Sequence, residues 1–207
     1  MRALTRRDLS RFLRTFARQL PCPTTLILTG GSEALVLGGT RPTGDVDFGL
    51  VVRSQRRWPE VEAAVAAAAR EARVVVQYSS DLDRWSSVTI PPRRRRTRPY
   101  RRVGRLSVRL LEPACWAVYK LARYLDADVE DLRTVLRRER VPSLALARLC
   151  GESLRASPRS TQLFLFRRQV EHFLAQHGRA IWGRRFDVSR TVAAFHRAAG
   201  IGRATPR

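Results

Sequence analysis

The spacing of apolar residues along the chain changes its period near residue 113. Ahead of that point, apolar runs of strand length cover residues 24–29, 45–52, 73–78 and 105–111. Two stretches there have a helical period, at residues 5–19 and 58–72. Beyond it the period is helical, over 114–125, 127–139, 143–156, 160–177 and 188–199. The pattern predicts an α+β fold, in which a small mixed-sheet core within residues 1–112 is followed by a helical domain of residues 113–207.

Local signals indicate where several of these elements begin and end. Thr5 is the expected N-cap of the first helix, with Asp8 in its first turn. Gly200 is expected to end the last helix. Residues 79–104 are rich in proline and arginine and lack a clear period, so we expect a long loop there.

The charge of the chain narrows the class of partner. The 207 residues carry a formal net charge of +22, from 40 basic and 18 acidic residues, which is more than solubility requires and favours a polyanion such as nucleic acid. Of the 40 basic residues 39 are arginine, in a chain rich in Ala, Leu and Val, so biased base composition is part of the cause. The same bias draws attention to Lys120, the single lysine.

Other composition signals exclude several classes. No apolar run approaches the roughly 18 residues that cross a bilayer, and the arginine-rich N-terminus lacks a signal-type apolar run. We therefore expect a cytoplasmic protein without a membrane partner. The cysteines are odd in number and far apart, so Cys22, Cys115 and Cys150 suggest neither a disulfide framework nor a zinc site and are expected to be buried.

Two aspartates share one face of the predicted strand 45–52. Side chains alternate along a strand, so Asp45 and Asp47 point one way while Val46 and Phe48 point the other way. Two adjacent carboxylates repel each other unless a cation lies between them. A pair of hard oxygen ligands with an open coordination sphere suits Mg²⁺, or Mn²⁺, that also holds phosphates.

A glycine turn precedes this carboxylate pair. Gly30, Gly31 and Ser32 lie between a predicted strand and the start of a predicted helix, where free backbone N–H groups and the helix dipole attract phosphate. The aspartates begin 13 residues after Ser32. A phosphate-binding turn combined with a metal-binding pair favours nucleotidyl transfer from a nucleoside triphosphate (NTP).

These residues resemble the signature of a known superfamily. The stretch GGSEALVLGGTRPTGDVDF is similar to that of the nucleotidyltransferase fold, which DNA polymerase beta and the antibiotic nucleotidyltransferases share: a glycine turn, a spacer, then two acidic residues among hydrophobic ones. The order of residues in this stretch resembles the motif of the bacterial toxin branch, the AbiEii and MenT-like proteins. The resemblance implies a nucleotidyltransferase core, with Mg²⁺ on Asp45 and Asp47 and nucleotide at Gly30, Gly31 and Ser32.

The same branch places a lysine and acidic residues in the helices that follow. Here LEPACWAVYKLARYLDADVEDLRTVL is similar, with Lys120, Arg123, Asp128 and Asp131 in corresponding places. The resemblance implies that Lys120 and Arg123 contact the nucleotide and that Lys120 and Asp131 belong to the catalytic set. The alternatives are a solvent-facing lysine and acidic residues that are favoured by the helix dipole.

The chain departs from the superfamily at one position. Active members usually carry a third carboxylate on a neighbouring strand, where residues 73–78 offer Gln77. Asp81, Asp83, Glu112 or Asp131 can take that role instead, and the general base stays open.

An arginine-rich segment lies between Asp83 and Glu112, with ten arginines and no acidic residue. Such a segment contacts phosphates without sequence discrimination, and Trp85 and Tyr100 can stack on unpaired bases. We predict an RNA-binding loop, with a solvated loop as the alternative. Its RNA-binding residues are Arg93, Arg94, Arg95, Arg96 and Arg98.

Together these features predict an enzyme that transfers a nucleoside monophosphate from an NTP to an RNA acceptor. The resemblance implies tRNA as the acceptor and a toxin–antitoxin system with an antitoxin protein as partner. Two alternatives remain: modification of a small molecule, for which the charge has no obvious use, and a non-catalytic RNA- or antitoxin-binding module on a degenerate nucleotidyltransferase fold.

Overall fold

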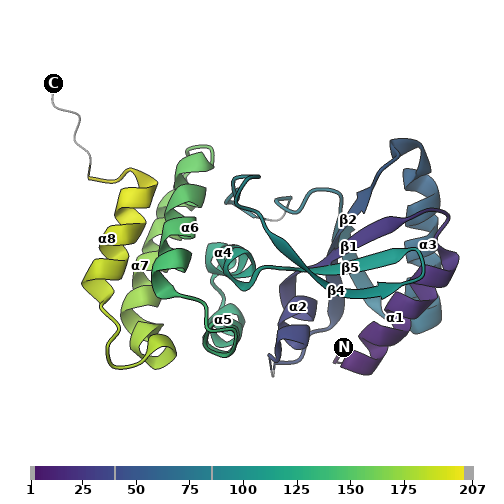
Figure 1. Cartoon of the computed structure of the whole chain (residues 1–207), viewed down its shortest axis with the longest axis horizontal. Coiled ribbons are helices and arrows are strands. Elements are labelled where there is room, and N and C mark those ends of the chain that lie inside the picture. The colour runs from purple at the N-terminus through teal and green to yellow at the C-terminus, as the bar shows by residue number, and fades with distance from the viewer. Residues whose placement is uncertain (1–2, 40, 85, 203–207) are drawn as a thin grey trace. The chain divides into compact units, whose positions relative to one another are not determined.

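The computed structural model describes residues 3–39, 41–84 and 86–202, which fall into two compact units (Figure 1). The first unit contains the described residues up to 84 together with 97–111. The second contains residues 86–96 together with 112–202. The sequence prediction placed residues 86–96 in the α/β part, whereas in the structure Val88 and Ile90 are fully buried and the segment belongs to the helical unit.

The first unit is built on a mixed five-stranded sheet. Its elements are α1 (Arg6–Gln19), β1 (Thr24–Leu28), α2 (Gly30–Leu37), β2 (Asp45–Val52), the 3-10 turn η1 (Gln55–Arg57), α3 (Trp58–Ala72), β3 (Val75–Ser79), β4 (Thr97–Val103) and β5 (Leu106–Leu111). The strand order is β3-β2-β1-β5-β4, with β1 antiparallel to β2 and parallel to β5. β3 runs parallel to β2, and β4 runs antiparallel to β5.

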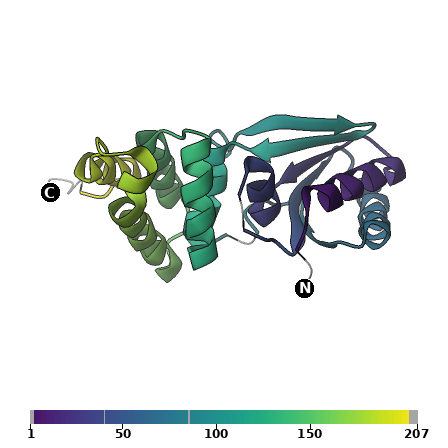
Figure 2. The ribbon, with the colours of Figure 1, turned by 90° about the horizontal axis from the view of Figure 1, so that it is seen from below.

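The alternation of β2 divides the sheet into an apolar face and a polar face. Val46 and Phe48 are fully buried, and the Phe48 ring packs against Phe12 of α1 and Tyr78 of β3, with ring centroids 5.7 and 5.5 Å apart. α1 and α3 lie side by side (Figures 1 and 2). Because side chains alternate along a strand, Asp45 and Asp47 lie on the face opposite to Val46 and Phe48.

The ends of the first helix follow the predicted signals. The Thr5 hydroxyl accepts a hydrogen bond from the Asp8 N–H, and the Asp8 carboxylate accepts one from the Thr5 N–H, each at 3.1 Å. This reciprocal pair is a capping box, which satisfies two backbone donors at the start of α1. The prediction of Thr5 as N-cap is confirmed.

The second unit contains five helices among the residues that the structure describes. They are α4 (Pro113–Arg123), α5 (Asp126–Arg138), α6 (Ser143–Ala156), α7 (Thr161–Trp182) and α8 (Val188–Ala199). Their core holds Trp116, Phe166, Phe173 and Phe195. The α+β prediction, with strands in the N-terminal and middle region and helices after them, is confirmed.

One strand lies inside the predicted loop of residues 79–104. β4 forms one edge of the sheet, and Tyr100, Arg101 and Arg102 on it are exposed. An edge strand with exposed arginines has no apolar alternation to mark it, and its charge protects the open edge from pairing with another chain. No helix in the described part of the chain has the length and apolar character needed to cross a membrane.

Candidate functional site

The glycine turn lies directly against the carboxylate of Asp47. Gly30 has a φ of +55°, and a Cβ added there would overlap the Asp47 side chain. The Gly31 N–H donates a hydrogen bond to Asp47 Oδ2 at 3.0 Å, and a Cβ on Gly31 would overlap the Thr43 hydroxyl. Both positions therefore require glycine, since the backbone must come this close to β2 and its preceding loop.

Asp45 is held by two neighbouring side chains. Its Oδ1 accepts a hydrogen bond from the Thr43 hydroxyl at 3.2 Å, and its Oδ2 accepts one from Gln77 Nε2 at 2.6 Å. Gln77 lies on β3, whose register places it opposite Asp47. Asp45 and Asp47 are both half-buried, so their carboxylates are oriented by the protein and still reach solvent.

Ser32 has a structural role that the sequence did not indicate. Its hydroxyl is fully buried and lies 3.0 Å from the Thr29 carbonyl oxygen and 2.9 Å from the Asp47 carbonyl oxygen, either of which can accept its proton. The same hydroxyl accepts a hydrogen bond from the Asp47 N–H at 3.2 Å. The Ser32 side chain therefore ties α2 to β2, and the predicted phosphate contact of this turn is one of backbone N–H groups.

The donor set on this face suits a hard divalent cation. Mg²⁺ usually keeps several waters and is held by one or two carboxylates together with substrate phosphates, so the two half-buried carboxylates Asp45 and Asp47 fit that requirement. No group of three or more Asp, Glu, His or Cys that could hold a metal is present among the described residues. Gln77 adds an amide whose oxygen is also a ligand type that Mg²⁺ accepts.

Gln77 is the residue of the neighbouring strand that contacts Asp45, and the acidic candidates for a third carboxylate belong to other elements. Asp81 lies in the turn after β3, where its Oδ1 accepts the Asp83 N–H at 2.9 Å. Glu112 precedes α4 and belongs to the second unit, as does Asp131. Within the first unit the carboxylate pair is thus completed by an amide.

Lys120 forms a buried ionic cluster with two aspartates of α5. Its Nζ lies 2.9 Å from Asp128 Oδ1 and 2.8 Å from Asp131 Oδ2, and the three side chains are 3%, 0% and 2% exposed. The Nζ also lies 5.5 Å from the centroid of the Trp116 ring. Arg123, which is 57% exposed, donates its Nε–H to Asp128 Oδ2 at 2.7 Å.

This cluster ties α4 to α5 within the second unit. Two of the three ammonium protons of Lys120 are directed to carboxylates, and its side chain is nearly inaccessible to solvent. The sequence predicted Lys120 as a nucleotide contact and Asp131 as a catalytic residue, whereas the structure pairs them with each other. Arg123 is the member of the cluster that reaches solvent.

The ionic cluster makes the stability of the protein depend on pH in the acidic range. Burial alone would raise the pKa of Asp128, but hydrogen bonds from Arg123 and the charge of Lys120 outweigh it and lower the pKa below the ordinary value of 3.8. The unfolded chain therefore binds this proton at a higher pH than the folded chain, so the stabilisation is complete above the ordinary value and is lost as the pH falls through the lowered value.

We expect the free energy of unfolding, measured with urea, to fall more between pH 7 and pH 3 in the wild type than in Asp128→Asn. Asp126→Asn, at an exposed position in the first turn of α5, is the control and should retain the wild-type difference. Equal pH dependence in the wild type and in Asp128→Asn would contradict this role of Asp128.

The predicted RNA-binding arginines are divided between the two units. Arg93 and Arg96 are in the second unit, where Arg93 is exposed, and Arg98 lies on β4 in the first. Arg94 pairs with Glu152 at 2.8 Å, and Arg95 donates to the Ile90 carbonyl oxygen at 3.4 Å, which anchors the segment to its own unit. Trp85, predicted to stack on bases, lies outside the described residues.

Sequence reasoning missed several contributors to these sites. Thr43 lies in a loop and Gln77 on another strand, so no local motif marks their contacts with Asp45. Cys115 and Cys150 are buried as predicted, and Cys22 is half-buried.

Comparison of the chain with protein-family models, curated proteins and solved structures gives no match.

Proposed function

We propose that this protein is a metal-dependent nucleotidyltransferase that moves a nucleoside monophosphate from an NTP to an RNA acceptor. One observation carries the proposal: two half-buried carboxylates, Asp45 and Asp47, share a strand face beside a glycine turn that opens a helix. Cation ligands and backbone N–H groups are the two features that binding of a triphosphate requires. The resemblance of the GGS and DVD stretches to the nucleotidyltransferase signature supports the same reaction.

The reaction breaks a phosphoanhydride bond of the NTP and forms a phosphodiester bond to the acceptor. A hydroxyl oxygen of the acceptor attacks the α-phosphorus, the bond from that phosphorus to the bridging oxygen of the β-phosphate breaks, and pyrophosphate leaves while a base takes the hydroxyl proton. Asp45 and Asp47 would hold Mg²⁺, and Thr43 and Gln77 would keep Asp45 oriented. A bound Mg²⁺ supplies charge neutralisation at the phosphoryl oxygens.

RNA is proposed as the acceptor because of charge. A formal charge of +22 favours a polyanion, while a small-molecule acceptor makes no use of it. The resemblance to the AbiEii and MenT-like branch supports tRNA as the acceptor, a role as the toxin of a toxin–antitoxin pair and an antitoxin protein as partner.

Incubation of the purified protein with each α-labelled NTP, Mg²⁺ and total tRNA tests the proposal. We expect label to enter RNA in a Mg²⁺-dependent reaction that releases pyrophosphate. Label that enters a small molecule but not RNA would contradict the acceptor, and an absence of transfer from all four NTPs would contradict the reaction.

A non-catalytic RNA- or antitoxin-binding module is the second candidate. It is favoured by the amide of Gln77 at the strand position that contacts Asp45, and by the hydrogen bond from Gly31 to Asp47, which gives that carboxylate a structural role without a metal. This candidate predicts RNA binding without label transfer in the same experiment.

A further inference from the structure

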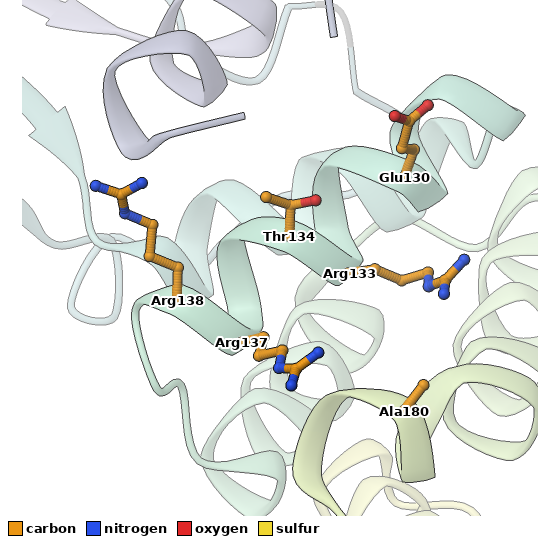
Figure 3. Close-up of a pocket in the computed structure, with 6 residues that line it drawn as sticks. All are labelled: Glu130, Arg133, Thr134, Arg137, Arg138 and Ala180. Carbon is orange, nitrogen blue, oxygen red and sulfur yellow. The ribbon is translucent and has the colours of Figure 1, made fainter. Parts of the chain in front are cut away.

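An open groove of about 560 Å³ lies in the second unit, between α5 and α7 (Figure 3). Its lining is Glu130, Arg133, Thr134, Arg137, Arg138 and Ala180. Three of these six residues are arginines, all exposed, and none is aromatic or a large aliphatic residue. Such a lining offers charge to a ligand and little apolar surface.

The arginines of the groove are not used inside the protein. Within the described part of the chain, the side chains of Arg133, Arg137 and Arg138 make no hydrogen bond or ion pair, whereas Arg94, Arg123 and Arg167 each pair with an acidic residue. Figure 3 shows Arg133 and Arg137 extending toward the side where α7 carries Ala180, while the Glu130 carboxylate points away from both.

The positive charge of the groove affects a neighbouring side chain. Burial lowers the pKa of His177 on α7, and the charge of Arg133 lowers it further. No acidic side chain pairs with Arg133 among the residues that the structure describes. Arg137 and Arg138 lie in the last turn of α5, where a cation interacts favourably with the helix dipole. Arg133 lies outside that turn, so the helix dipole does not account for its charge.

The spacing of the arginines matches a repeating anion. Arg133 and Arg137 are four residues apart on one helix, hence about 6 Å apart along its axis and on one face. Successive phosphates of a nucleic-acid strand are separated by a similar distance. A guanidinium presents a planar fork that binds phosphate oxygens bidentately.

We propose that the α5–α7 groove binds the phosphate backbone of RNA through Arg133 and Arg137, without reading base sequence. The absence of aromatic residues from the lining leaves no surface on which a base stacks, so contacts to phosphates remain. The inference deepens the proposed function, because it gives the RNA acceptor a binding surface, and it rests on that function only for the choice of RNA as the polyanion.

The test measures binding of a fluorescent single-stranded RNA by anisotropy at several salt concentrations, without NTP. For the variant Arg133→Gln/Arg137→Gln we expect weaker binding and a slope of log K against log salt that is flatter by about 0.7 for each phosphate that the variant no longer neutralises. The weakening should be equal for oligouridine and oligocytidine. Arg148→Gln/Arg190→Gln is the control, since it removes the same charge from exposed arginines of α6 and α8 and should leave the slope close to wild type.

A second variant keeps the test valid if the first one folds poorly. Ala180→Glu changes an exposed residue of α7 and introduces a carboxylate into the groove, and it should also weaken RNA binding. Wild-type affinity for RNA in both variants, with an unchanged slope in Arg133→Gln/Arg137→Gln, would overturn the proposal. Binding of polyglutamate is measured in the same way. The proposal would also be overturned if Arg133→Gln/Arg137→Gln bound RNA as the wild type does but no longer bound polyglutamate, because that result would assign the groove to an acidic protein. Asp45→Asn should bind RNA as the wild type does, so failure of nucleotide transfer is distinguished from failure of the groove.

Discussion

Asp45→Asn and Asp47→Asn, made separately, are each expected to reduce Mg²⁺-dependent transfer of a labelled nucleotide to RNA by at least about 100-fold, the scale on which removal of a charge-stabilising group acts. The reason is that an amide keeps the shape of the carboxylate but loses the charge that holds the cation. Asparagine is preferred to alanine because its oxygen can still accept the Gly31 N–H, which Asp47 accepts in the wild type. The measurement is the initial rate of label transfer.

The control for both variants is Asp126→Asn, at an exposed position in the second unit. It makes the same chemical change away from the carboxylate pair and should keep wild-type activity. Thermal unfolding of Asp47→Asn should stay close to that of the wild type, since its oxygen still accepts the Gly31 N–H. Asp45→Asn keeps one acceptor oxygen for Thr43, and the Gln77 amide can turn its own oxygen toward the new NH₂ group, so a small change in stability is expected. Wild-type transfer rates in either Asp45→Asn or Asp47→Asn would remove the basis of the proposed reaction.

Lys120→Met is expected to cost about 3–5 kcal/mol of unfolding free energy, the decrease typical when one partner of a buried ion pair is removed. Asp131 is 2% exposed and would lose the ammonium that lies 2.8 Å from it, whereas Asp128 would keep Arg123. Denaturant unfolding checks the value. Arg133→Met, at an exposed position of α5, is the control and should change stability by less than about 0.5 kcal/mol.

Two further variants test how the charges of the ionic cluster contribute to stability. Lys120→Met/Asp131→Leu removes both charges and should recover part of the stability, because a well-packed apolar pair replaces a buried ionic one at little cost. Lys120→Arg keeps the charge but puts a larger group beside Trp116, so a smaller decrease in stability is expected. A stability of Lys120→Met equal to wild type would show that the ionic cluster does not support the fold.

The elements that could be predicted from the sequence are those whose burial imposes a period. β2 and α3 occupy the predicted residues 45–52 and 58–72 because each has one buried face. β4 could not be predicted, since its exposed positions carry arginine and tyrosine and the neighbouring β5 supplies the pairing. Pairing between strands is a tertiary property that a local pattern does not record.

The candidate site also combines features that the sequence predicts with features that depend on tertiary packing. The shared face of Asp45 and Asp47 follows from the alternation of a strand, and it could be predicted. The hydrogen bond from Gln77 depends on the register of β3 against β2, which the sequence does not specify. The residue types around Lys120 were also visible in the sequence, but the burial that pairs the ammonium with Asp128 and Asp131 depends on how α4 packs on α5.

The hydrogen bond from the Gly31 N–H to Asp47 bears on the order in which ligands bind. This donor is one of those that a phosphate would use at the start of α2, and the carboxylate occupies it. A cation that draws Asp47 toward itself would release the donor, so metal and triphosphate should reinforce each other's affinity by the same factor, as thermodynamic linkage requires. Without a cation, Asp47 would compete with a triphosphate for the turn, so the proposed function predicts weaker binding of a nucleotide that carries no metal.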